Sequence, residues 1–215
     1  MRYVIGVDEA GRGPLAGPVA VGVVAVPEGF DVAEEFPGVR DSKKLSEKKR
    51  EALYAMLEAR AAQGDVRFSV ELESAEAIDR EGIAVVIHRA LARGVERTVS
   101  ECTRGTLVSM GDTRVPLVSN DDFYILLDGA LRAPPEYSQE TIIHGDDLVP
   151  LISLASIAAK VERDRLMVAL AQMHPEYGFE THKGYGTRTH YEALKKYGLS
   201  AVHRRSFIHL APEGE

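Results

Sequence analysis

Residues 4–14 decide the fold and read VIGVDEAGRGP. They begin as an apolar run typical of a strand, and two adjacent acids, Asp8 and Glu9, stand at its end. The loop that follows, Gly11-Arg12-Gly13, holds an arginine between two glycines. Glycine frees backbone amides and a guanidinium matches phosphate oxygens, whereas adjacent carboxylates suit a hard divalent cation. Taken alone, the stretch indicates phosphodiester chemistry no more strongly than an acidic strand end before a flexible turn.

The periodicity of the rest of the chain predicts a mixed α/β domain. The valine-rich run 18–26 pairs with the strand at 3–8 as a central hairpin, and residues 66–70 alternate like a half-buried strand. The further predicted strands are 123–127 and 141–144, with an inserted hairpin of 107–110 and 115–118. The predicted helices are 47–62, 83–101, 153–173 and 187–196. The helix stripes place Met56, Ile157, Val161 and Ala169 inward, and Glu162 and Arg163 outward.

Composition limits the possible classes of protein. A chain of 215 residues suits one domain with a modest appendage. The lone Cys102 excludes an internal disulfide framework, and no apolar run reaches the roughly 18 residues of a membrane helix, so a cytoplasmic protein is expected. The net charge of −7 is unusual for a nucleic-acid enzyme, but residues 182–209 carry six Lys or Arg residues against Glu192 alone. Binding depends on such a local face.

Carboxylates recur where predicted strands end. Asp128 ends the strand at 123–127, and Asp146 opens the loop before the long helix. Hydrolysis of a phosphodiester by two divalent ions, roughly 4 Å apart, requires several carboxylates that converge from separate elements. For any single one of these acids, a solvated loop position is the ordinary alternative. Asp147 could replace its neighbour as a ligand, and Asp164 is expected to pair with Arg163, Arg165 or a nearby loop.

The segment from Asp8 to Pro18 resembles the opening signature of ribonuclease HII, the type 2 ribonucleases H. Further blocks follow in the order of that family, with a gap near 101–122. They are DSKKLS at 41–46, LDG at 127–129, GD at 145–146, ISLASIAAKVERD at 152–164, YGF at 177–179, HKGYGT at 182–187 and HRRSF at 203–207. A single GRG tripeptide is weak evidence, whereas seven ordered blocks are strong.

The resemblance implies a ribonuclease H-like fold, a mixed five-stranded sheet flanked by helices. Residues 1–173 would form the catalytic core, and residues 174–215 a small C-terminal helical segment that closes one side of the substrate groove. The catalytic and metal-binding positions of the family fall on four acids of this chain. They are Asp8, Glu9, Asp128 and Asp146.

The same resemblance implies the activity. It is an endonuclease that hydrolyses the RNA strand of RNA–DNA hybrids and cuts 5′ to single ribonucleotides in duplex DNA. Two Mg²⁺ or Mn²⁺ ions would serve, and the products would carry 3′-hydroxyl and 5′-phosphate ends. A monomer without a membrane is expected, with a replication clamp as a possible partner.

The substrate-binding roles are implied in the same way. Gly11, Arg12, Gly13 and Tyr185 would read the junction from a ribonucleotide to a deoxyribonucleotide, and the 2′-hydroxyl is the group that marks it. Lys43 and Lys44 would contact phosphates. Lys183 and Arg204 are candidate phosphate contacts, which position without reading sequence. Each of these residues also has an ordinary alternative. Tyr185 could be a packing aromatic, Arg12 a solvated turn residue, and Lys43 and Lys44 an exposed loop pair. Arg204 could tie the C-terminal segment to the core acids.

One position departs from the family pattern. His144 stands where a lysine usually precedes Gly-Asp. Since a histidine is only partly charged at neutral pH, its electrostatic help would be weaker or more dependent on pH.

Ribonuclease HIII is a sister family that carries an extra N-terminal domain, and a signature that begins at residue 8 is expected to leave no room for one. Two alternative functions remain open. A non-catalytic binder of hybrid or junction nucleic acid would be favoured by loss of one of the four acids. A phosphatase acting on small molecules would be favoured by a small closed pocket.

Overall fold

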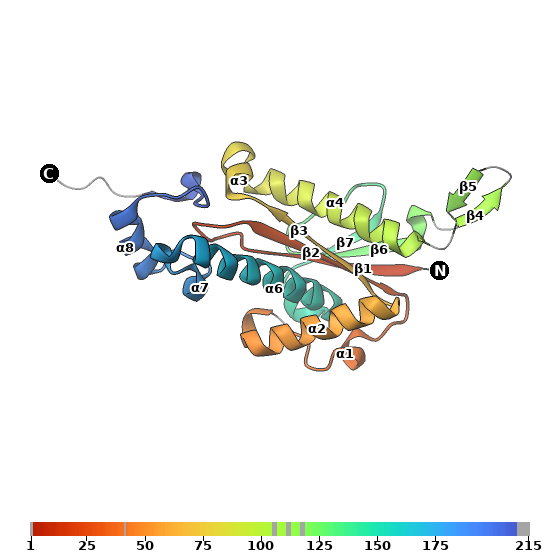
Figure 1. The fold of residues 1–215 in the computed structure, drawn as a ribbon. Helices are drawn as coiled ribbons and strands as arrows, with labels where there is room; N and C mark the ends of the chain where they lie inside the picture. The colour runs from red at the N-terminus through yellow and green to blue at the C-terminus, as the bar shows by residue number, and fades with distance from the viewer. Residues whose placement is uncertain (1, 41, 105–106, 111–112, 117–118, 210–215) are drawn as a thin grey trace.

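The computed structural model describes residues 2–40, 42–104, 107–110, 113–116 and 119–209. Its centre is a five-stranded sheet in the order β3-β2-β1-β6-β7 (Figure 1). The strands are β1 (Tyr3–Ala10), β2 (Val19–Pro27), β3 (Arg67–Glu73), β6 (Phe123–Asp128) and β7 (Ser138–Ile142). β1 pairs antiparallel with β2 and parallel with β6, so the sheet is mixed. The predicted central hairpin and the mixed five-stranded sheet are confirmed.

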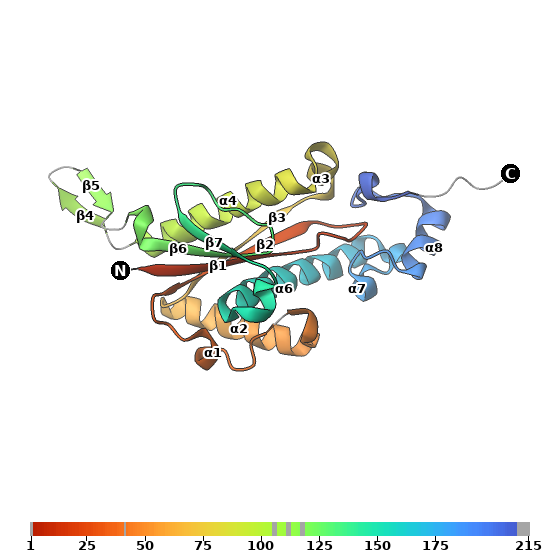
Figure 2. The ribbon, with the colours of Figure 1, turned by 180° about the vertical axis from the view of Figure 1, so that it is seen from behind.

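Helices cover both faces of the sheet. The helices α3 (Ala75–Glu81) and α4 (Ile83–Thr103) lie on one face, and α2 (Glu47–Gln63) and α6 (Pro150–Met173) lie on the other (Figures 1 and 2). Two separate apolar clusters correspond to these two layers. Burial on both faces explains why β2 is an almost continuous apolar run. None of the helices in the described part of the chain combines the length and apolar character needed to cross a lipid bilayer.

The helix α6 packs against the sheet through two glycines. A Cβ atom on Gly6 would lie 2.6 Å from the carbonyl oxygen of Leu151, and one on Gly22 would lie 2.2 Å from that of Ala155. Both distances are far below van der Waals contact, so only glycine allows the helix backbone to come this close. The close packing holds the N-terminal half of α6 against β1 and β2, next to the acids that end β1.

Most predicted helix boundaries are confirmed. Ser46 caps α2 and Gly64 ends it in the left-handed conformation. Thr187 caps α8 (Arg188–Tyr197), and Gly198 follows its end. The remaining helices are α1 (Val32–Glu35), α5 (Gly145–Leu148) and α7 (Phe179–His182), and 3₁₀ turns cover Ser42–Lys44, Asn120–Asp122, Pro175–Tyr177 and Arg205–Phe207.

The inserted hairpin is confirmed as β4 (Leu107–Met110) and β5 (Thr113–Pro116), an antiparallel pair outside the main sheet. Its second strand begins two residues before the predicted start, and the predicted end at residue 118 lies outside the described residues. β7 ends at Ile142, before the predicted end at residue 144.

Several burial predictions are wrong. The alternation predicted for residues 66–70 does not expose Ser69, which is buried and bonds Thr98 and the carbonyl of Gly94 on α4. Met56 and Ala169 are exposed, not inward. Arg163, predicted to face solvent, is fully buried. The periodicity of a sequence cannot reveal these cases, because it does not show which neighbouring helix or sheet packs against a given helix or strand.

The C-terminal segment, residues 174–209, packs at one end of the sheet. It shares an apolar cluster with Leu15 and Ala16 of the β1–β2 connection and with the last turns of α6. An isolated bridge joins Ala16 to His203. The connection after β1 is therefore held between α6 and this segment.

Candidate active site

Two of the predicted acids come together because of strand register. The parallel pair β1 and β6 is in register up to Val7 and Leu127. The next residue on each strand is an aspartate, Asp8 and Asp128. Parallel neighbours end at the same edge of a sheet, so both carboxylates lie at that edge. This is the edge at which α/β sheets bind ligands.

Asp146 joins this edge from a third segment. It lies in α5, which follows β7, and its backbone N–H donates to Oδ1 of Asp128 at 3.3 Å. The hydroxyl of Ser153 donates to the carbonyl of Asp146 and fixes the start of α6 beneath it. His144 precedes this turn in the left-handed conformation, which is uncommon for a residue other than glycine. The tight turn brings Asp146 back over the sheet.

The neighbouring Asp147 has a different environment. It is exposed and pairs with Lys44 at 2.7 Å, and this hydrogen bond lowers the pKa of its carboxyl. Asp146 is buried beside Asp128. Asp164 lies on α6 and pairs with Lys160 at 2.8 Å, with Arg50 at 3.7 Å and with Arg163 at 4.0 Å. Both alternative acids are thus engaged with cations.

Mutual repulsion and burial act on the acids of β1. Burial raises the pKa of Asp8 well above its usual range, and the charges of Glu9 and Asp128 raise it further. Burial also raises the pKa of Glu9, against the opposing effect of the Arg12 guanidinium. Such shifts mark a cluster in which positive charge is in short supply.

Two basic side chains already neutralise part of the cluster. The Nζ atom of Lys43 lies 3.2 Å from Oδ2 of Asp146, and Nε of Arg12 donates to Oε1 of Glu9 at 2.9 Å. Lys43 precedes Lys44 on the short 3₁₀ turn before α2, and Ser42 of the same turn shares a 2.9 Å hydrogen bond with Ser156 of α6. Residues 42–44 are thereby attached to the acidic edge.

The donor set fits hard divalent cations, because all of its oxygens are carboxylate oxygens. The Oε2 atom of Glu9 is buried and has no hydrogen-bond partner in the described part of the chain, so it is available to a cation. In the side-chain positions of this structure, however, no three His, Cys, Asp or Glu residues among those described form a ready metal cage. Ion binding would need the carboxylates to leave Lys43 and Arg12.

A hollow of about 290 Å³ opens beside Glu9, which is the one of the four acids that lines it. The Gly11-Arg12-Gly13 loop and Glu9 line one side, and Lys43, Lys160 and Tyr185 complete the wall. The Tyr185 ring is 42% exposed, with Nζ of Lys160 at 5.7 Å and Cζ of Arg163 at 5.8 Å from its centroid. The structure thus brings together the predicted loop, the predicted tyrosine and one predicted lysine.

The loop is supported from behind by buried arginines. Gly11 has φ +89°, and a Cβ atom there would lie 2.0 Å from Nε of Arg163. Arg163 donates to the backbone carbonyls of Ala16, Pro18 and Lys183. Arg204, predicted as a phosphate contact, is fully buried behind the loop and does not line the hollow. Instead of pairing with acids of the core, it donates to backbone carbonyls.

Lys183 is also absent from the lining of the hollow. Its side chain donates to the carbonyl of Glu180, within its own segment. Sequence reasoning missed Ser42, Ser156 and Lys160 as parts of the site. The last two lie four residues apart within the ISLASIAAK block, so the helical i, i+4 spacing was a signal that could have placed them on one face.

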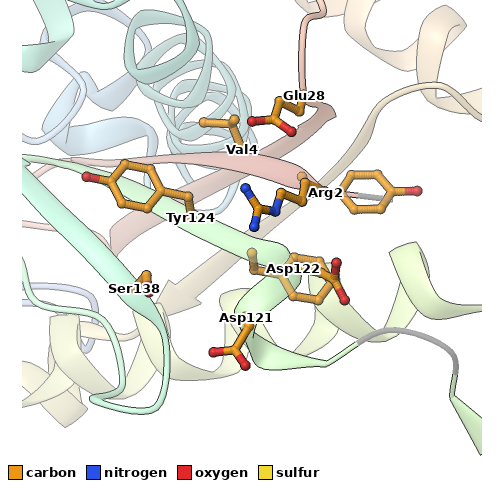
Figure 3. Close-up of a pocket in the computed structure, with 9 residues that line it drawn as sticks. Arg2, Val4, Glu28, Asp121, Asp122, Tyr124 and Ser138 are labelled. Atoms are coloured by element: carbon orange, nitrogen blue, oxygen red, sulfur yellow. The ribbon is translucent and has the colours of Figure 1, made fainter.

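A larger hollow of about 360 Å³ lies at the opposite end of the sheet. Arg2 points into it, near Asp122 and Tyr124 (Figure 3). It sits at the start of β1 and β6, whereas ligands of α/β sheets bind at the carboxyl ends of strands. It contains none of the four predicted acids, and we assign the active site to the smaller hollow.

Comparisons with known proteins agree with this geometry. Residues 5–210 match the family model described as Ribonuclease HII. The chain is 38% identical to the ribonuclease HII of Clostridioides difficile (strain 630) over 96% of its own length and 70% of that protein. It resembles the crystal structure of ribonuclease H2 from Pyrococcus horikoshii OT3, with a TM-score of 0.65, 26% identity and coverage of 95% and 93% of the two chains. It also resembles the ribonuclease HII of Archaeoglobus fulgidus solved in complex with PCNA, with a TM-score of 0.65, 25% identity and 98% coverage of both.

Proposed function

The chain belongs to the ribonuclease HII family, and on this premise we propose that it cuts 5′ to single ribonucleotides embedded in duplex DNA and leaves 3′-hydroxyl and 5′-phosphate ends. Membership of the family makes it a metal-dependent endoribonuclease of the type 2 ribonuclease H class, which acts on RNA–DNA hybrids. The finer specificity is supported by the shared hollow of the glycine-rich loop and Tyr185.

The observation that carries the proposal is the convergence of acids from three segments. Asp8 lies in the last residues of β1, Asp128 ends its parallel neighbour β6, and Asp146 donates its backbone N–H to Asp128. We assign the metal-holding role to these three and Glu9. Mg²⁺ or Mn²⁺ ions held by these acids would lower the pKa of a water and offset charge on the phosphate and the leaving oxygen.

The residues of the chain perform the remaining tasks. Arg12 and the backbone of Gly11 and Gly13 bind the phosphate on one side of the hollow. The ring of Tyr185 packs against a sugar on the other side, where the 2′-hydroxyl distinguishes a ribonucleotide. Lys43 contacts a phosphate once it leaves Asp146, and Lys44 and Lys183 position the backbone farther out.

We further propose that residues 1–173 act as the catalytic core and residues 174–215 as the substrate-binding segment. The support is that Tyr185 comes from the segment, whereas the four acids come from the core. We expect a monomer. Because the Archaeoglobus fulgidus relative was solved with PCNA, a replication clamp is the partner to test, by co-elution of the two proteins in size-exclusion chromatography.

The deciding experiment uses a duplex that contains one ribonucleotide, incubated with purified protein with and without magnesium. We expect one cut 5′ to the ribonucleotide, and a loss of about a hundredfold or more in Asp128→Asn. Asp147→Asn is the matched control, since that acid is exposed and paired with Lys44. Full activity of Asp128→Asn would overturn the assignment, and tight binding without any cut would favour the non-catalytic alternative.

A further inference from the structure

Arg204 holds two peptide planes of the glycine-rich loop. Its Nη2 atom donates to the carbonyl of Gly11 at 2.7 Å, and its Nη1 atom donates to that of Arg12 at 3.1 Å. In a trans peptide the N–H points opposite to the C=O. The N–H groups of Arg12 and Gly13 are therefore directed away from Arg204. Because these residues line the hollow and Arg204 does not, the arginine turns two amide donors towards the substrate side.

The preceding residue, His203, is linked to Tyr185 through a second histidine. Nε2 of His203 and Nε2 of His190 lie 3.1 Å apart, and Nδ1 of His190 lies 2.9 Å from the carbonyl oxygen of Tyr185. At the other end, Nδ1 of His203 is 3.0 Å from the backbone N of Ser200 and 2.8 Å from its hydroxyl. Both histidines are buried.

The partners fix the tautomer of each ring. A carbonyl only accepts, so Nδ1 of His190 carries the proton, and Nε2 of a neutral His190 must accept. His203 therefore donates from Nε2, and its Nδ1 accepts from the N–H of Ser200. Every nitrogen has one consistent role when both rings are neutral. Burial lowers the pKa of both histidines, and that of His203 falls to about 4, which agrees with this assignment.

The two residues share a fixed anchor on the core. The backbone N–H of Arg204 donates to the carbonyl of Leu15 at 2.8 Å, and His203 forms an isolated bridge with Ala16. On the tyrosine side, the backbone N–H of Leu15 donates to the carbonyl of Gly184, the residue before Tyr185, at 2.8 Å. The backbone at Leu15 and Ala16 therefore sets the distance between the glycine-rich loop and Tyr185.

We propose that the consecutive residues His203 and Arg204 are the positioning pair that fixes Tyr185 relative to the Gly11–Gly13 loop, and so determines the preference for a single ribonucleotide over a continuous hybrid. The inference rests on the proposed function of loop and tyrosine. Neither residue lines the hollow. Arg204 acts through two carbonyls, and His203 acts through His190.

The test separates the two hydrogen bonds of His203. In His203→Gln the side-chain amide can replace the Nε2 donor, and in His203→Asn the side-chain oxygen can replace only the Nδ1 acceptor. We compare kcat/KM on a duplex with one ribonucleotide and on an RNA–DNA hybrid. We expect His203→Asn to lower the ratio of kcat/KM on the single ribonucleotide to kcat/KM on the hybrid about tenfold. His203→Gln should lower this ratio clearly less. His174→Gln is the control. The His174 ring packs against Tyr177 and Phe179, outside the link from His203 to Tyr185.

Equal losses of the ratio in the two folded variants, or no loss in either, would overturn the proposal. If the variants do not fold, nitrogen chemical shifts of the wild-type rings decide the matter. We expect the Nδ1–H tautomer at His190 and the Nε2–H tautomer at His203. The opposite tautomers would refute the hydrogen-bonded link from His203 through His190 to Tyr185. A wild-type protein that cuts neither substrate would contradict the proposed function instead. The tautomers would still test the link from His203 through His190 to Tyr185.

Discussion

The ammonium group of Lys43 lies 3.2 Å from Oδ2 of Asp146, although 103 positions separate the two residues in the chain. The lysine side chain is 77% exposed and the aspartate is buried. Because the lysine side chain stays largely in water, its replacement should cost little stability. A phosphate could take the place of the Asp146 carboxylate as the partner of this ammonium group.

Replacement of this lysine by a neutral residue should weaken substrate binding. For Lys43→Met we expect KM for the hybrid to rise about tenfold and its dependence on salt to fall by about one counterion, because one phosphate contact is lost. Measurements of KM over a series of salt concentrations test this. Lys48→Met on the exposed surface of α2 is the control. An unchanged salt dependence in Lys43→Met would show that the lysine serves Asp146 only.

Removal of the tyrosine ring should affect the two substrates differently. In Tyr185→Ala we expect about a tenfold loss of kcat/KM on a single ribonucleotide and a smaller loss on long hybrids, where neighbouring contacts compensate. Tyr197→Ala is the matched control, because that tyrosine is exposed on the same segment but does not line the hollow. Equal losses on both substrates would mean that Tyr185 does not read the junction.

Acid should destabilise the C-terminal segment through its histidines. The pKa of His203 is about 4 in the folded protein, against an ordinary value of 6.5. Between these two pH values the unfolded chain binds a proton that the folded chain does not, so the free energy of unfolding rises with pH. The contribution is complete above pH 6.5 and is lost as the pH falls towards 4, by up to about 3 kcal/mol.

The groups around His203 also affect its protonation. His190 shares its proton, His182 stacks on His190 with ring centroids 4.5 Å apart, and His174 and Tyr177 lie nearby. Denaturant unfolding of wild type and His203→Gln at several pH values isolates the His203 contribution. Parallel stability curves for the two proteins between pH 4 and 6.5 would contradict it.

The close approach of α6 to the sheet should make Gly22 intolerant of any side chain. We expect Gly22→Ala to lower the free energy of unfolding by about 3 kcal/mol, because the new Cβ atom would lie 2.2 Å from the backbone oxygen of Ala155. Chemical denaturation measures the change. Val85→Ala at an exposed position of α4 should cost under about 0.5 kcal/mol. A similar small cost for Gly22→Ala would show that the helix can move away.

Much of the fold could be predicted from local chemistry. Ser46, Gly64, Thr187 and Gly198 mark helix ends through capping and chain reversal, which involve only neighbouring residues. The burial errors at Met56, Arg163 and Ala169 arose because one-dimensional periodicity cannot show which partner layer covers a helix. Ser69 faces α4 for the same reason.

For the active site, the sequence indicated that Asp8 and Asp128 stand near the ends of buried strands, and both lie in the last residues of β1 and β6. The choice between Asp146 and Asp147 depended on the resemblance, and their catalytic roles stay predictions. The tertiary structure alone decided that Arg204 lies behind the glycine-rich loop and that His203 reaches Tyr185 through His190. The physical reason is that local sequence fixes dihedral preferences and strand ends, whereas these hydrogen bonds join groups that only the packed structure brings together.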